Sequence, residues 1–138
     1  MIQLVPLSPL DKTGYLIPFV TERIIEFSRQ HMDEMTPEIY ARAVLSKLLH
    51  QPNDILVLAR VGAKGDVVGH GIASMETDGI KRRVFVSQCR VDPGEGSSDP
   101  TTVRRCIEYT EQWGSERGAT DLLMSTARSD ESRYARSS

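Results

Sequence analysis

The run Ile55–Val61 constrains the fold of this chain more than any other segment. It reads ILVLARV, and every residue in it except Arg60 is apolar. A continuous apolar run of this length is typical of a strand, and its lack of alternation indicates a strand covered on both faces. The chain is therefore expected to build a sheet with helices on both sides.

Two antiparallel partner strands are predicted after this run, each reached through a short turn. The first covers residues 67–76 and is rich in small side chains, and the second covers residues 83–91. Alternation in the second strand predicts that Val84 and Val86 lie on one face of the sheet. The opposite face is then expected to carry Phe85, Ser87 and Cys89.

Three helices are predicted from apolar spacing and from the residues at their ends. The first covers about residues 18–30, and the second follows Thr36, a residue type that caps helix N-termini. The third begins at Pro100 behind a similar cap, Asp99. Gly118 stands where a helix C-terminus favours glycine.

The remaining elements complete an α/β fold. Residues 2–7 and 121–127 are predicted strands, and residues 129–138 are a candidate final helix. The order is therefore β-α-α-β-β-β-α-β, with an optional last α, and its strand–helix–strand crossover should give one parallel pair. We predict a single domain over residues 1–138, with a mixed, mostly antiparallel sheet and helices on both faces.

Composition excludes several classes of protein. The 138 residues include 17 Lys and Arg against 19 Asp and Glu, a balance that does not favour a nucleic-acid partner. The two cysteines make neither a disulfide framework nor a metal cluster. No apolar run is long enough to cross a membrane, and the N-terminus lacks the pattern of a signal peptide. A soluble cytoplasmic protein is the expectation.

Residues 54–127 resemble the GNAT acyltransferases, which move an acetyl group from acetyl-CoA to an amine. The resemblance rests on three segments taken in order: DVVGHG at residues 66–71, VDP at 91–93 and EQWGSERGA at 111–119. It implies a GNAT-like fold, acetyl-CoA as co-substrate, and a small-molecule or protein amine as acceptor.

The family's pyrophosphate motif, Arg-Gly-x-Gly-x-Gly, is degenerate in this chain. It falls on residues 98–103, where none of the glycine positions holds glycine. Asp99 is expected to cap the helix with its own carboxylate, and Pro100 removes a backbone donor, so the phosphate site is filled from within. The family's strands six and seven are also expected to be absent.

These departures leave a second function open. The alternative to an N-acetyltransferase is a catalytically inactive GNAT-fold module that binds other proteins, for example a structural subunit of a phage virion or another large complex. In that case the protein would be located in the virion, and an oligomer or an assembly partner would be expected.

The resemblance implies three candidate catalytic residues. Tyr134 is the candidate acid that protonates the departing CoA thiolate, or else a half-buried aromatic on a terminal helix. His70 and Glu76 are candidate bases for the acceptor amine. The alternatives are that His70 packs against a helix and that Glu76 is solvated.

The resemblance also implies an acetyl-CoA site. The backbone at Cys89 and Val91 is expected to pair with the pantetheine arm as an added strand would. Phosphate contacts are expected from the loop before the third helix and from its first turns, or else these residues form an ordinary connection and a charged surface. They are Gly96, Ser97, Ser98, Thr101, Thr102 and Arg104.

Overall fold

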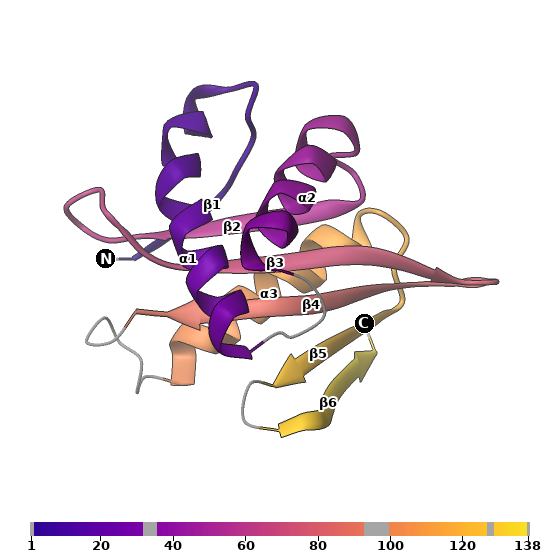
Figure 1. Cartoon of the computed structure of the whole chain (residues 1–138). Coiled ribbons are helices and arrows are strands. Elements are labelled where there is room, and N and C mark those ends of the chain that lie inside the picture. Colours follow the sequence, from indigo (N-terminus) through magenta and orange to yellow (C-terminus); the bar gives the residue numbers. More distant parts are fainter. Residues whose placement is uncertain (1, 32–35, 93–99, 127–128, 138) are drawn as a thin grey trace.

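The computed structural model describes residues 2–31, 36–92, 100–126 and 129–137. The chain order confirms the predicted alternation of strands and helices up to the last element (Figure 1). The elements are β1 (Gln3–Pro6), the 3-10 helix η1 (Lys12–Leu16), α1 (Ile17–His31), α2 (Pro37–His50), β2 (Ile55–Val61), β3 (Val67–Asp78), β4 (Lys81–Val91), α3 (Pro100–Ser115), β5 (Asp121–Thr126) and β6 (Ser129–Ser137).

One sheet carries all six described strands in the order β1-β2-β3-β4-β5-β6. Every neighbouring pair is antiparallel except β4 and β5, which are parallel as the crossover through α3 requires. Helices α1 and α2 cover one face of the sheet and α3 covers the other (Figure 1). The mixed α/β architecture is therefore confirmed.

Strand β2 divides two apolar cores. All of its residues are buried, as its sequence predicts. Val57 and Ala59 pack with α1 and α2, whereas Leu56 and Leu58 pack with α3. The apolar run thus supplies both layers with core, which explains why it does not alternate.

A β-bulge in β4 corrects one prediction. Ile72 pairs with Gln88 and the next residue, Ala73, pairs with Val86, so Ser87 is an extra residue. An extra residue reverses the alternation of side chains beyond it. Cys89 therefore faces α3, and its predicted place on the same face as Ser87 is wrong.

The last element also differs from the prediction. Residues Ser129–Ser137 form a strand, β6, which pairs antiparallel with β5, so the expected final helix is wrong. The sheet accordingly has a sixth strand where none was expected. Helical spacing is weakly marked in this polar segment, and the open edge of β5 offers it backbone partners.

Helix α3 lies close to β4 and ends as predicted. A methyl group added at Gly114 would lie 2.3 Å from Cγ2 of Val84, so the helix approaches the sheet at a position without a side chain. Gly118 has a φ of +86°, and its N–H bonds the carbonyl of Ser115 at 3.1 Å. The predicted N-cap Asp99 lies outside the described residues.

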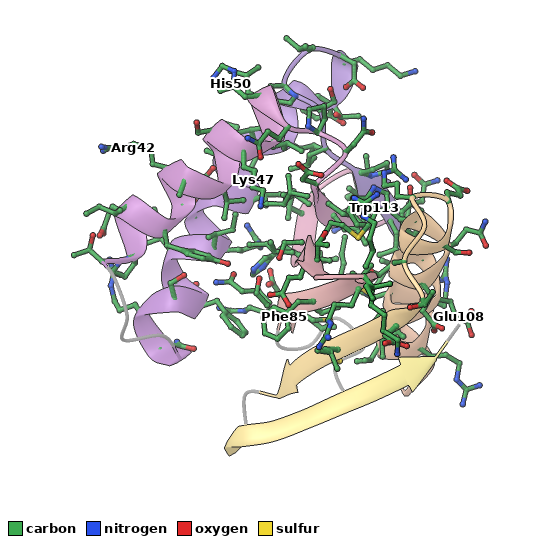
Figure 2. The ribbon with its side chains drawn as sticks, turned by 90° about the vertical axis from the view of Figure 1, so that its right-hand side faces the viewer. Arg42, Lys47, His50, Phe85, Glu108 and Trp113 are labelled. Carbon is green, nitrogen blue, oxygen red and sulfur yellow. The ribbon has the colours of Figure 1, made fainter. Side chains whose placement is uncertain are left out.

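Helix α2 begins after Thr36, as predicted. The carbonyl of Thr36 accepts a hydrogen bond from the N–H of Tyr40 at 3.0 Å, but its side chain makes no capping bond. Figure 2 shows Arg42 and His50 projecting from α2 away from the sheet, whereas Trp113 lies between α3 and the sheet. No helix in the described part of the chain is long and apolar enough to span a membrane.

Candidate functional site

Strands β4 and β5 separate partway along the sheet. Their parallel register runs from Arg83 opposite Asp121 to Val86 opposite Met124. Beyond that point β4 continues to Val91, and Figure 1 shows the two arrows moving apart toward their tips. The bulge at Ser87 stands where the separation begins, and bulges bend the strand that carries them.

The backbone of β4 beyond the bulge directs alternate hydrogen-bonding groups toward the β5 side. The N–H of Asp92 bonds the carbonyl of Val68 on β3 at 2.9 Å. Because backbone groups alternate in direction along an antiparallel pair, those of Arg90 also point to β3, and those of Cys89 and Val91 point away from it. We call the stretch Cys89–Val91 the β4 edge.

The side chains of the β4 edge are half-buried on both faces of the sheet. The sulfur of Cys89 lies 3.9 Å from that of Cys106 on α3. Their hydrogen bond holds the pKa of Cys89 below its usual value and raises that of Cys106, to which burial adds. Cys106 is buried in the α3 core.

A buried polar chain lies behind β4 on the α1 side. Nε2 of His70 lies 2.7 Å from Oε1 of Gln88, and Nε2 of Gln88 donates to the hydroxyl of Ser28 on α1 at 2.9 Å. The His70 ring has no exposed surface and packs edge-on against Phe27. Burial lowers the pKa of His70 to about 4, so the ring is neutral at pH 7.

An ion-pair cluster fastens the end of β4 to α1. Arg23 on α1 donates to the Asp92 carboxylate at 2.8 Å and to the carbonyl of Val67 at 2.6 Å. Arg90 lies 3.7 Å from Asp92 and 3.3 Å from Glu26. The cluster fixes the strand immediately after the β4 edge. No local motif marks a pair such as Arg23 and Asp92, so sequence reasoning missed it.

Helix α2 contacts the bulge directly. The phenol oxygen of Tyr40 lies 3.1 Å from the hydroxyl oxygen of Ser87, and burial raises the pKa of Tyr40. Sequence reasoning missed this contact as well, because no local pattern links Tyr40 to Ser87. The pair fixes the extra residue of the bulge against α2.

The other two catalytic candidates lie at different distances from the separation. Glu76 is exposed and pairs with Arg83, three positions before Val86 and so about 10 Å along the strand. Tyr134 lies in β6 opposite Met124, which pairs in turn with Val86. The backbone of Tyr134 therefore lies level, across the strands, with the point where β4 and β5 begin to separate.

Half of the six predicted phosphate contacts lie outside the described residues. The residues that the structure does not describe are Gly96, Ser97 and Ser98. Thr101 and Thr102 lie in the first turn of α3, and Arg104 is exposed on the same helix. The structure thus brings the start of α3 and the β4 edge to the same end of the sheet, since α3 follows β4 directly (Figure 1).

Comparison with solved structures identifies the fold. The chain is similar to AAC(6')-Iy in complex with the bisubstrate analog CoA-S-monomethyl-acetylneamine, with a TM-score of 0.69, 13% identity, and coverage of 95% of this chain and 82% of that one. It is also similar to a possible acetyltransferase from Clostridium difficile 630, with a TM-score of 0.67, 8% identity, and coverage of 95% and 83%.

A third similar structure is the ribosomal-protein-alanine N-acetyltransferase from Brucella melitensis biovar Abortus 2308. The TM-score is 0.62 and the identity 14%, with coverage of 90% of this chain and 80% of that one. No protein-family model matches the sequence, and no curated protein matches it. The chain therefore has the fold of the GNAT acetyltransferases.

Proposed function

We propose that this protein is an acetyl-CoA-dependent N-acetyltransferase whose pantetheine site is the β4 edge. The observation that carries this proposal is the separation of β4 from β5 beyond Val86, which leaves outward backbone groups at Cys89 and Val91. An extended amide-bearing arm can bond such groups as an added strand does. A structural neighbour named for its complex with a CoA conjugate supports the same ligand.

The reaction transfers an acetyl group in one displacement. The acceptor amine attacks the thioester carbonyl, the carbon–sulfur bond breaks, and the CoA thiolate leaves and takes up a proton. Tyr134 is the proposed source of that proton, because its backbone lies level with the point of separation. The acceptor is an amine of unassigned structure.

The amine's proton is proposed to leave through water. His70 is sealed from solvent, and its pKa of about 4 makes it a poor base at neutral pH. Glu76 is accessible but lies about 10 Å from the separation. A chain of water molecules agrees with these positions better than either side chain does.

The alternative of an inactive assembly module has no specific observation in its favour. The neighbours reported above are named as acetyltransferases or carry a CoA conjugate in their name. The outward backbone groups of the β4 edge also fit a ligand that enters between two strands.

A proline at Val91 tests the site. The outward N–H of Val91 makes no bond to β3, so Val91→Pro removes the proposed pantetheine donor while it spares the ladder. We expect calorimetry to show at least a roughly tenfold loss of acetyl-CoA affinity. This is the loss expected when one neutral hydrogen bond is removed and its acceptor on the ligand is left unsatisfied.

The matched control is Val91→Ala, which shortens the side chain but keeps the amide. It should bind acetyl-CoA with an affinity close to that of the unaltered protein. Equal affinity for the proline and alanine variants, both folded by circular dichroism, would contradict the proposed pairing.

A further inference from the structure

The two cysteines of the chain lie next to each other across the α3 core. Cys89 is on β4 and Cys106 is on α3, and their sulfur atoms are 3.9 Å apart. A disulfide needs about 2.05 Å between the sulfurs, so the two sulfur atoms must approach by about 2 Å to bond. The sequence holds 2 cysteines, so any internal disulfide joins this pair.

The space around Cys106 is shaped by a glycine. Gly71 on β3 stands opposite Cys89, and a methyl group added there would lie 3.4 Å from the Cys106 sulfur. A cavity of about 10 Å³ adjoins the same sulfur, lined also by Thr110 and Val86. This space leaves the Cys106 side chain room to change rotamer, which a close-packed core would not.

The two thiols differ in access. Cys89 is half-buried and belongs to the β4 edge, whereas Cys106 is only 4% exposed. The hydrogen bond between the two thiols holds the pKa of Cys89 below its usual value, so Cys89 supplies the thiolate that attacks first. Cys106 lies within reach to complete the exchange.

We propose that Cys89 and Cys106 are a reactive dithiol that low-molecular-weight disulfides convert into an internal disulfide. The Cys89 thiolate attacks one sulfur of the small disulfide, forms a mixed disulfide and expels one thiolate. The Cys106 sulfur then attacks the Cys89 sulfur and expels the second thiolate, which takes up the Cys106 proton. Two protein thiols are oxidised, and one small disulfide is reduced to two thiols.

The position of Cys89 couples this chemistry to the acetyl-CoA site, a link that rests on the proposed function. The backbone of Cys89 is a proposed partner of the pantetheine arm. Bound acetyl-CoA should cover the β4 edge and slow the first attack.

The test uses the full chain, reduced and then incubated with oxidised glutathione. Free thiols are titrated over time, and intact mass is measured without reductant. We expect both thiols to disappear together, with a monomer that has lost two hydrogen atoms and carries no glutathione. A stable glutathione adduct, a disulfide-linked dimer or two persistent thiols would overturn the inference.

Two variants assign the roles. Cys106→Ser should stop at one glutathione on Cys89, and Cys89→Ser should keep its remaining thiol unreacted. If either variant fails to fold, the mass of the unaltered chain still decides the outcome, because no other cysteine is present. Modification of Cys106 in the absence of Cys89 would contradict the assigned order of attack.

A parallel incubation with oxidised glutathione and saturating acetyl-CoA tests this inference separately from the proposed function. Severalfold slower loss of thiols supports both. Disulfide formation at an unchanged rate would leave the dithiol standing and count against acetyl-CoA at the β4 edge. Acetyl-CoA binding detected by calorimetry, with no disulfide formed in the glutathione experiment, would leave the acetyl-CoA site standing and overturn the dithiol inference.

Discussion

His70 occupies a position where burial decides its chemistry. Its ring has no exposed surface, it shares a hydrogen bond with Gln88, and Arg90 and Arg23 add positive potential nearby. Burial is the largest cause of its lowered pKa, because the charged form would lose its hydration. The residue therefore serves the packing of β3 against α1 as a neutral group.

This lowered pKa predicts a loss of stability in mild acid. The folded-state value of about 4 lies below the ordinary value of 6.5, so the unfolded chain binds more protons between these two values. The contribution is fully present above about pH 6.5 and is lost as the pH falls toward 4. Between pH 7 and pH 5 we expect a loss of about 2 kcal/mol in urea unfolding.

His70→Gln is the control for this titration. Glutamine is uncharged at both pH values and can still donate a hydrogen bond to Gln88, so its unfolding free energy should change less over the same interval. An equal change in the variant and the unaltered protein would assign the acid sensitivity to other groups.

At the scale of the elements, α3 contacts β4 through Gly114, a residue that has no side chain. Gly114→Ala would place a methyl group 2.3 Å from Cγ2 of Val84, which is 1% exposed. Alanine gains about 1 kcal/mol of helix propensity, but the overlap costs more, so we expect a net destabilisation of about 2 kcal/mol by urea unfolding.

A second substitution distinguishes overlap from other causes. Val84→Ala removes the Cγ2 atom and by itself costs stability through the cavity that it leaves. In the double variant the new methyl should fill part of that space, so the two costs should sum to more than the measured loss. Additive costs would show that Gly114 is required for another reason.

The elements also show which parts of this fold a sequence can predict. The burial of β2, the helix ends at Thr36 and Gly118 and the parallel crossover follow from local patterns, and the structure has them. The bulge at Ser87 follows from how β3 and β4 align, which periodicity in one strand does not contain. That bulge is what turns Cys89 toward α3.

The candidate site depends on such long-range alignments even more. The pairing of Arg23 with Asp92 joins residues 69 positions apart, and the VDP segment that holds Asp92 does not point to Arg23. The strand β6 forms because β5 has an open edge, a property of the assembled sheet. Cys89 and Val91 were predicted as ligand contacts through the family resemblance, and they remain proposals supported by their backbone directions.

At the scale of the whole molecule, the end of the sheet that carries the β4 edge also carries the start of α3. Asp99 precedes that helix and is predicted from sequence to occupy its free N–H groups. Asp99→Gly should therefore strengthen acetyl-CoA binding severalfold by calorimetry, at a cost of only a few tenths of a kcal/mol in stability. Unchanged or weaker binding would contradict the self-capping prediction.

Amide hydrogen exchange tests the central claim most directly. Arg90 directs its backbone N–H to β3, whereas those of Cys89 and Val91 point to the side that β5 has left. Residue-resolved exchange should be slow at Arg90 with or without ligand, and saturating acetyl-CoA should slow exchange at Cys89 and Val91 at least about tenfold. Exchange at Cys89 and Val91 that stays equally fast with acetyl-CoA bound would contradict the account.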